Sequence, residues 1–215
     1  MPGVPPASVA IIGGGVVGRN AARVAAGLGA KVNILDVNLD TLDQLGNILP
    51  HNVFPIFANS YTIERSLRDA DLVIGAVLIP GAKAPRLIRR EDLKIMKPGA
   101  VLVDVAIDQG GCAETSRPTT HADPVYVVDD IIHYCVANMP GAYARTSTFA
   151  LNNHTIKYGL KLASQPVEKV CREDFALRRG LNMYKGAITF KPVAEAFGME
   201  VFYRPVEEVV GAVSG

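Results

Sequence analysis

The sequence has few cysteines, no excess of charge and no long hydrophobic run. Its 3 cysteines are Cys112, Cys135 and Cys171, and this small odd number argues against a disulfide framework and for a reducing compartment. The net charge is +1, which offers no electrostatic basis for a nucleic-acid partner. No apolar run reaches the roughly 18 residues of a membrane helix. We therefore expect a soluble cytoplasmic protein with no nucleic-acid partner and no membrane association.

The chain also lacks the marks of a secretory signal or of disorder. Residues 1–8 contain neither a basic region nor an apolar core, so they do not resemble a signal peptide. Hydrophobic residues make up 49% and charged residues 20% of the 215 residues, close to globular averages. This length fits one large domain, or one domain and part of another.

A glycine-rich segment follows an apolar stretch near the N-terminus. Residues 8–13 form a short apolar run ending in glycine, typical of a strand buried on both faces of a parallel sheet. The next residues fit G-x-G-x-x-G at Gly13, Gly15 and Gly18. A helix is predicted after them because four apolar side chains recur along one stripe, namely Val17, Ala21, Val24 and Leu28.

Each glycine of this motif has a physical reason. Gly13 permits the tight turn out of the strand, Gly15 lets the backbone approach a pyrophosphate, and Gly18 lets the helix pack closely on the strand. The start of the helix adds unpaired N–H groups and a partial positive charge. We therefore predict that a dinucleotide binds Gly13, Gly14, Gly15, Val16, Val17 and Gly18.

An acidic residue ends the second predicted strand, residues 31–35. Asp36 follows Gly18 at close to the ~20 positions expected of the acid that binds the ribose hydroxyls. It would repel a 2′-phosphate, and residues 37–40 contain no arginine, so NAD is favoured over NADP. Two alternatives remain at this stage: FAD, which shares the fingerprint, and a glycine-rich turn of another α/β protein with Asp36 as a solvated residue.

Strand and helix patterns alternate up to about residue 128. We expect further strands at 53–57, 71–75, 100–105 and 125–128, and helices at 63–68 and 89–96. This alternation predicts a Rossmann-type, doubly wound parallel sheet. Beyond residue 141 the alternation stops, and the pattern predicts a long helix at 146–162 capped by Thr146, a helix at 166–179, a strand or hairpin at 185–190 and a short helix at 193–197.

Ligands of doubly wound sheets bind beyond the carboxyl ends of the strands, so the loops there are candidate sites. Asp108 lies between an apolar strand and a Gly-Gly pair, an unusual place for a carboxylate without a function. Asn138 and Met139 follow the last strand, and with the loop after Gly75 they are expected to rim the nicotinamide end. Asp104 and His133 are expected to be structural, the first as a hydrogen-bond acceptor and the second in the core.

Six segments together resemble the bacterial L-alanine dehydrogenase family, and the resemblance covers nearly the whole chain. They are residues 11–18, 35–38, 71–85, 103–111, 114–121 and 133–141. The Asp-Gln-Gly-Gly and Asn-Met-Pro-Gly blocks are specific to this enzyme and its transhydrogenase relatives. Those relatives tend to carry Glu where Asp108 stands, which favours the alanine enzyme.

The resemblance implies an NAD-dependent oxidoreductase that converts L-alanine and water to pyruvate and ammonium, and a homo-oligomer. It implies that Asp108 is the catalytic aspartate, which orients water and ammonia. It also implies nucleotide contacts at Gly13 to Gly18, Asp36, Val77, Leu78, Ile107, Asp108, Asn138 and Met139.

The front of the chain departs from the family, whose members begin with a substrate lobe. Here Met1 is followed directly by residues 2–6, Pro-Gly-Val-Pro-Pro, which resemble the family's interdomain linker. We expect residues 1–140 to be the NAD-binding domain and residues 141–215 to belong to an otherwise missing substrate lobe, which an N-terminal partner chain would supply. The alternatives are a stand-alone or vestigial NAD-binding module without turnover and, more weakly, the NAD-binding component of a transhydrogenase.

Overall fold

The computed structural model describes residues 3–77 and 84–211. The chain divides into two compact units, Met1–Met139 and Pro140–Gly215, which are described one at a time. In the described ranges, no helix combines the length and the apolar character that crossing a membrane requires.

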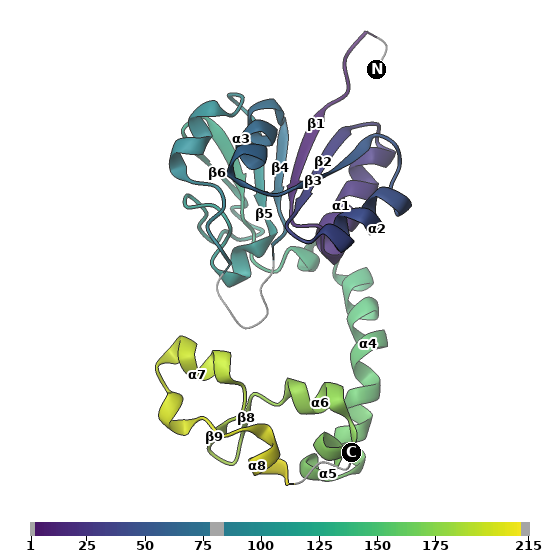
Figure 1. Ribbon diagram of the computed structural model, residues 1–215, viewed down its shortest axis with the longest axis vertical. Coiled ribbons are helices and arrows are strands. Elements are labelled where there is room, and N and C mark those ends of the chain that lie inside the picture. The colour runs from purple at the N-terminus through teal and green to yellow at the C-terminus, as the bar shows by residue number, and fades with distance from the viewer. Residues whose placement is uncertain (1–2, 78–83, 212–215) are drawn as a thin grey trace. The chain divides into compact units, whose positions relative to one another are not determined.

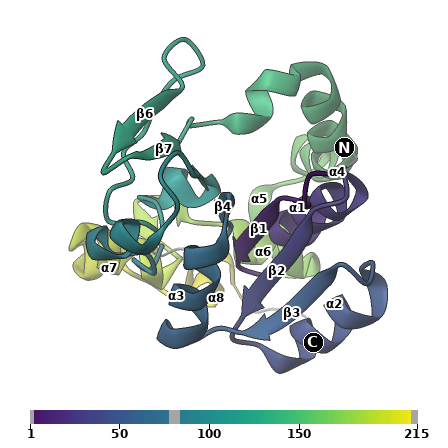
Figure 2. The same cartoon turned by 90° about the horizontal axis from the view of Figure 1, so that it is seen from above.

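The N-terminal unit is built on one seven-stranded sheet of order β3-β2-β1-β4-β5-β7-β6 (Figures 1 and 2). All neighbours are parallel except β6 and β7. The Rossmann-type α/β fold predicted from the sequence is therefore confirmed. The strands are β1 (Ser8–Ile12), β2 (Lys31–Asp36), β3 (Val53–Phe57), β4 (Leu72–Gly75), β5 (Val101–Asp104), β6 (Val125–Val128) and β7 (Ile131–Tyr134).

The antiparallel edge strand β6 is the one departure from an all-parallel sheet. Asp129 and Asp130 connect it to β7, and both have positive φ angles, 48° and 62°. Two consecutive residues of this kind form the tight turn of a β-hairpin, whose strands must be antiparallel. This local turn sets the direction of β6, whereas helical crossovers set the direction of β1 to β4.

Three helices connect the first four strands: α1 (Val16–Gly27), α2 (Leu39–Ile48) and α3 (Ser60–Asp69). The period of two along β1 divides its side chains between two hydrophobic clusters. Val9 and Ile11 belong to the cluster that contains apolar side chains of α1 and α2. Ala10 and Ile12 belong to the cluster that contains those of α3. The sheet is thus covered on both faces (Figure 1).

The buried face of α1 is not the stripe that the helical period indicates. Its buried residues are Gly18, Ala22 and Ala26, whereas Val24 and Leu28 are 61% and 86% exposed. Small residues let the helix axis come close to the sheet, and larger side chains would hold it away. Of the predicted stripe, Val24 and Leu28 therefore lie on the outer side of α1, whereas Ala21 packs partly against the core and Val17 lines a cavity described below.

The C-terminal unit is mainly helical, as the sequence predicts, but the boundaries of its elements differ: the hairpin spans residues 183–188, not 185–190, and the short helix after it begins at Lys191, not at residue 193. The long helix α4 begins at Ala144 and is preceded by Tyr143, not capped by Thr146, and none of its residues is buried. The predicted helix 166–179 is two helices. Asp174, with extended backbone angles, separates them, and its side chain caps the second by accepting hydrogen bonds from the N–H groups of Ala176 and Leu177.

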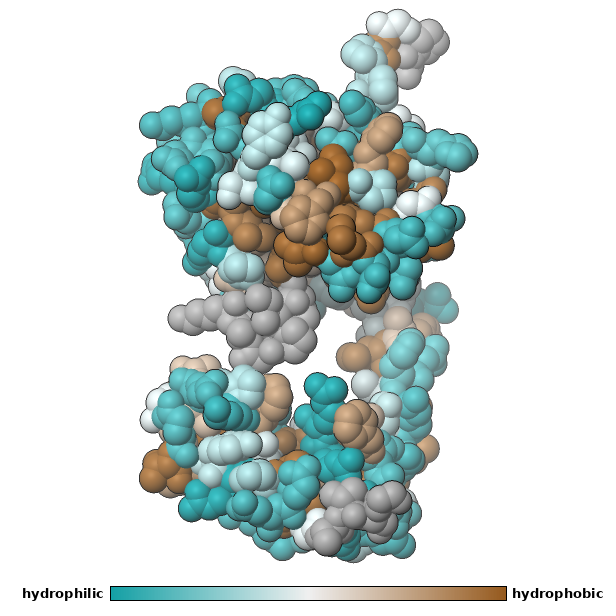
Figure 3. All heavy atoms as spheres, in the orientation of Figure 1, coloured by the Kyte–Doolittle hydropathy of each residue, from teal (hydrophilic) through white to brown (hydrophobic). Residues whose placement is uncertain are grey.

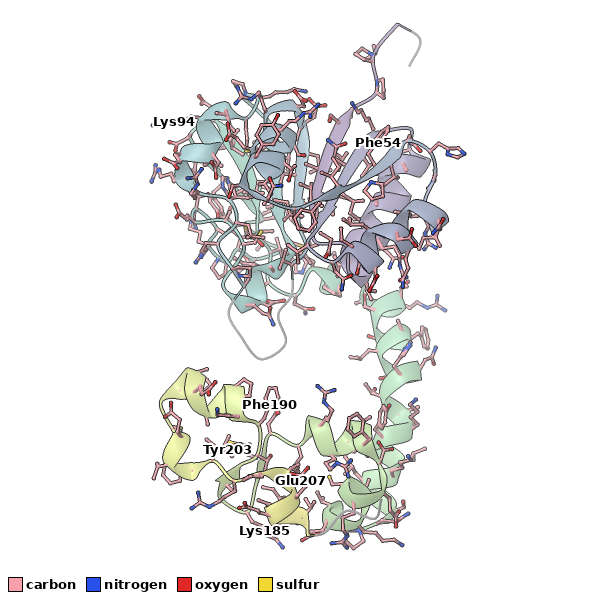
Figure 4. All side chains as sticks on the ribbon, viewed as in Figure 1. Phe54, Lys94, Lys185, Phe190, Tyr203 and Glu207 are labelled. Carbon is pink, nitrogen blue, oxygen red and sulfur yellow. The ribbon has the colours of Figure 1, made fainter. Side chains whose placement is uncertain are left out.

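A small hairpin, β8 (Met183–Tyr184) and β9 (Ala187–Ile188), lies in the middle of this unit. Lys185, labelled in Figure 4, lies at the hairpin turn with a φ of 48°. Its ammonium group lies 2.7 Å from the carboxylate of Glu168, and this contact lowers the pKa of Glu168 to about 2. The elements are η3 (Met139–Tyr143), α4 (Ala144–Ser164), α5 (Val167–Glu173), α6 (Phe175–Gly180), β8 (Met183–Tyr184), β9 (Ala187–Ile188), α7 (Lys191–Phe197), η4 (Glu200–Phe202) and α8 (Val206–Val210).

Candidate nucleotide site

The turn between β1 and α1 can be made only by glycine at two positions. Gly13 has a φ of 106°, and a Cβ atom there would lie 2.7 Å from the carbonyl oxygen of Ala76 on the neighbouring strand's exit. A Cβ atom on Gly18 would overlap the carbonyl oxygen of Gly13. The first turn of α1 therefore packs directly against the backbone of the turn.

Gly15 has a different environment. A Cβ atom there would meet no atom within 4 Å, so the space in front of this residue is open. Gly15 is also the N-cap of α1, and neither a capping side chain nor an acidic residue occupies the first turn. The first N–H groups of a helix have no partners within it, so they face this open space with the positive end of the helix dipole.

Asp36 ties the end of β2 to the glycine turn. One carboxylate oxygen accepts a hydrogen bond from the N–H of Gly14 at 2.7 Å, and the other accepts one from the N–H of Asn38 at 2.9 Å. A carboxylate has about four lone-pair sites, so these bonds leave acceptor capacity for further donors. The Asn38 side chain caps α2 through the N–H of Thr41.

A cavity of about 570 Å³ brings the turn and the acid together. Its wall is mainly apolar, and it opens at the carboxyl ends of β1, β2 and β4. Apolar side chains also gather on the front of the N-terminal unit, toward its lower edge, in Figure 3. The lining residues are Ile12, Gly13, Gly15, Val16, Val17, Leu35, Asp36, Val37, Ala58, Ala76, Val77, Pro85 and Leu87.

The structure thus groups six of the predicted site residues around one cavity, and Gly14 and Gly18 complete its turn. Seven wall residues were missed by sequence reasoning: Ile12, Leu35, Val37, Ala58, Ala76, Pro85 and Leu87. They are apolar and carry no chemical signature. The one signal that could have found some of them is position, because Val37, Ala58 and Ala76 directly follow the last residues of β2, β3 and β4. Leu78, also predicted, lies outside the described residues.

The other predicted residues lie on two loops and are not among the described residues that line this cavity. Asp108 is exposed on the short helix η2 (Val105–Gln109), next to Ile107, which is 3% exposed. Asn138 has a φ of 56°, and its carbonyl oxygen lies 3.1 Å from Nε2 of His121. Met139 is half-buried and begins η3.

Asp104, His133 and the cysteines have structural environments. Asp104 is fully buried and accepts several hydrogen bonds. The His133 ring is buried, contacts the hydroxyl of Thr115 at 2.8 Å through Nε2, and lies 2.9 Å from the carbonyl oxygen of Ile131 through Nδ1. Burial lowers the pKa of His133 and raises the pKa of the Cys112 and Cys135 thiols. All three cysteines are buried and free.

The fold and this cavity define a Rossmann-type α/β protein with a glycine turn and a strand-end acid. Comparison with known proteins identifies the group more closely. Residues 1–191 match the family model described as "Alanine dehydrogenase/PNT, C-terminal domain". The chain belongs to this family.

Individual relatives agree with the family model. The chain is 55% identical over 200 residues to an alanine dehydrogenase of Halomonas elongata, a match covering 93% of this chain and 54% of that protein. A solved L-alanine dehydrogenase is similar with a TM-score of 0.83 and 46% identity, over 92% of this chain and 55% of that one. A transhydrogenase from Sinorhizobium meliloti has a TM-score of 0.66 and 30% identity, over 77% of this chain and 47% of that one. The chain spans about half the length of the curated relatives it matches.

Proposed function

We propose that this chain is the NAD-binding part of an alanine dehydrogenase. The observation that carries the proposal is the single cavity that joins the start of α1 to the carboxylate of Asp36. The family relationship and the similarity to L-alanine dehydrogenases support the choice of reaction.

The residues present fit a dinucleotide. The open space at Gly15, bordered by helix N–H groups, suits a diphosphate, because backbone N–H groups and the helix dipole both favour anions. Asp36 keeps acceptor capacity for the two ribose hydroxyls and would repel a 2′-phosphate, which favours NAD over NADP. We assign the cofactor contacts to residues 13–18, Asp36 and Val77, and by family resemblance to Leu78, Ile107, Asp108, Asn138 and Met139.

In the proposed reaction, L-alanine, water and NAD⁺ give pyruvate, ammonium, NADH and a proton. Bound NAD⁺ would supply the acceptor for the hydride that leaves the alanine Cα. We assign to Asp108 the role of holding the reacting water and the departing ammonia by accepting hydrogen bonds from them. Its exposed position on η2 leaves the carboxylate accessible to a substrate.

Hydride transfer requires the alanine Cα to be held against the nicotinamide from both sides. Because the chain spans about half of its relatives, we propose that a second lobe completes the substrate site, with residues 140–215 contributing to it. We further propose a homo-oligomer working in the cytoplasm, where three free buried thiols remain reduced. By itself, this chain is expected to bind NAD and to turn over alanine poorly.

Isothermal calorimetry of the purified chain with NAD and NADP tests the nucleotide site. Asp36→Ala is expected to weaken NAD binding about ten- to a hundredfold, since hydrogen bonds to a charged group contribute roughly 1.5–3 kcal/mol. Asp40→Ala is the matched control, because Asp40 is an exposed acid in the first turn of α2 that is not among the lining residues of the cavity. No NAD binding by the wild type, or equal affinities of the two variants, would refute the site.

A coupled assay with L-alanine, repeated after adding a separately produced N-terminal lobe of a relative, tests the reaction. NADH formation that depends on alanine and rises on mixing is the expected result. Tight NAD binding with no turnover in either case would instead favour the stand-alone module. Hydride exchange between two different nicotinamide nucleotides without alanine would favour the transhydrogenase component, for which the similarity to the Sinorhizobium meliloti protein is the supporting observation.

A further inference from the structure

Both ends of the loop that carries Asp108 are hydrogen-bonded to one buried carboxylate, that of Asp104. Asp104 is the last residue of β5 and is 0% exposed. One of its oxygens accepts a hydrogen bond from the N–H of Ala106 at 3.1 Å, at the start of the loop. The other accepts from the N–H groups of Cys112 and Ala113, at 2.8 and 3.3 Å, where the loop ends.

A side-chain hydroxyl completes this arrangement. Ser116 donates a hydrogen bond to the same oxygen that binds Cys112 and Ala113, at 2.5 Å. Among the described residues, three backbone N–H groups and one hydroxyl therefore donate to Asp104, and the Cys112 thiol is a further donor. A buried charge is costly unless hydrogen bonds compensate for it, and here the compensation comes from the two ends of one loop. Moving either end would leave the carboxylate short of donors.

Two glycines leave room for the carboxylate. Gly111 has a φ of 80°, and a Cβ atom there would lie 2.7 Å from Asp104 Oδ2 and from Ser116 Cβ. A Cβ atom on Gly75 would overlap the sulfur of Cys112 and lie 3.4 Å from Asp104 Oδ1. The second residue of the Gly-Gly pair after Asp108, Gly111, must therefore be glycine, since only glycine lets the backbone come close enough to Asp104.

The end of the loop is also held from the outside. The carbonyl oxygen of Cys112 accepts hydrogen bonds from the N–H groups of Leu87 and Ile88, at 2.7 and 3.1 Å, and the N–H of Ala84 donates to the carbonyl oxygen of Gln109 at 3.0 Å. These bonds locate residues 109–112, and two backbone hydrogen bonds, from the N–H of Gly111 to the carbonyl oxygen of Ala106 and from the N–H of Gly110 to that of Ile107, connect them to the start of the loop. Asp104 is the side chain that binds both ends. Asp108 lies between the two attachments and is exposed.

We infer that Asp104 is a positioning residue that holds the loop of residues 105–113 closed, so that Asp108 stands at the place where substrate reacts. This inference rests on the proposed function, in which Asp108 holds water and ammonia. Only a carboxylate serves here. An asparagine has one acceptor oxygen and two N–H donors, so one end of the loop would face a donor in place of an acceptor.

The test compares Asp104→Asn with Asp92→Asn. Asp92 is a matched control because it too is a buried acid, 7% exposed, that accepts a backbone hydrogen bond, from Arg89. It belongs to η1 (Arg90–Ile95), and its carboxylate binds Arg89 and not residues 105–113. Hydrogen–deuterium exchange of the full chain is the first readout. Asp104→Asn is expected to speed exchange at the amides of Ala106, Cys112 and Ala113 about tenfold or more, and Asp92→Asn to leave them unchanged.

The second readout is the rate of alanine oxidation by the chain mixed with the N-terminal lobe of a relative. Asp104→Asn is expected to lower kcat about ten- to a hundredfold, because small displacements of a reacting group have effects of that size. The calorimetric affinity for NAD is expected to fall clearly less than kcat, because of the assigned cofactor contacts this loop carries Ile107 and Asp108 and the others lie elsewhere. Ser116→Ala removes one of the donors to Asp104 and is expected to speed exchange and to lower kcat by smaller factors. This variant keeps the test decisive if Asp104→Asn does not fold.

The outcomes separate this inference from the proposed function. If Asp104→Asn and Ser116→Ala match Asp92→Asn in both exchange and kcat, or if they weaken NAD binding as much as kcat, the positioning role is wrong. If the wild type neither binds NAD nor oxidises alanine in any form, the proposed function is wrong, whereas the exchange experiment still decides whether Asp104 holds the loop closed.

Discussion

The two units of this chain bury their side chains to very different extents. In the N-terminal unit, both faces of the sheet carry hydrophobic clusters with fully buried isoleucine, leucine and valine side chains. In the described part of the C-terminal unit, the buried apolar residues are Val170, Cys171, Ile188, Ala194 and Val210. The contrast shows that the N-terminal unit contains an extensive core of its own, whereas the described part of the C-terminal unit buries few apolar side chains.

Exposed apolar side chains in the C-terminal unit agree with this interpretation. Phe149 on α4 is 57% exposed, Phe175 is 62% exposed and Phe197 is 74% exposed. The 21-residue helix α4 has no buried residue and contacts α5 only near one end, although packing is the main source of helix stability in proteins. We connect this to the proposed second lobe, which would cover these side chains.

The largest expected effect comes from separating the two units. Residues 1–139 alone are expected to unfold in one cooperative thermal transition, because both faces of their sheet are covered from within. Residues 140–215 alone are expected to show no cooperative transition, because so small a core cannot offset the loss of chain entropy. Calorimetry of both fragments beside the full chain measures this. A sharp transition in the shorter fragment would contradict the comparison.

Adding a single methyl group in the N-terminal unit should have the next largest effect on stability. Gly18→Ala is expected to lower the free energy of unfolding by about 1–3 kcal/mol or more through overpacking, because the new Cβ would overlap the Gly13 carbonyl. Gly27→Ala in the same helix meets no atom within 4 Å and should stabilise by about 0.5–1 kcal/mol. Urea unfolding measures both. Equal effects would show that α1 does not pack as described.

Acid pH should lower the stability of the N-terminal unit, because His133 is buried in it. Burial lowers the pKa of His133 below its ordinary value of 6.5. Well above pH 6.5 the ring is neutral in both states and its titration does not affect stability. As the pH falls below 6.5, the unfolded chain takes up a proton that the folded chain does not, so the free energy of unfolding decreases. The Tm of the wild type should therefore fall more steeply between pH 7.5 and 5 than that of His133→Gln. Parallel slopes would exclude this role.

The smallest expected effect concerns the outer stripe of α1. Leu28 is 86% exposed, so Leu28→Ser should change the free energy of unfolding by less than about 0.5 kcal/mol, as is usual for surface substitutions. Urea unfolding and sedimentation velocity are the measurements. A loss of 2 kcal/mol, or a change in oligomeric state, would show that a second copy of the chain covers this stripe.

Local patterns determined much of the nucleotide unit. The run of residues 8–13, the glycine motif and Asp36 lie close together in the sequence and form a contiguous strand–turn–helix–strand unit, so their spacing was enough to predict their arrangement. The hairpin around Lys185 and the short helix α7 were equally local. These elements depend on periodicity and turn chemistry, both of which a short window of sequence contains.

Tertiary structure decided what such windows do not contain. The buried face of α1 depends on how closely the helix approaches β1, and this favours Gly18, Ala22 and Ala26 over the larger Val24 and Leu28. The sequence indicated that Asp104 would accept hydrogen bonds. Its donors come from residues 106 to 116, and which of them reach the carboxylate depends on the folded conformation of the loop. The wall of the cavity is likewise made of apolar residues from separate strand ends, which have no common feature until the sheet brings them together.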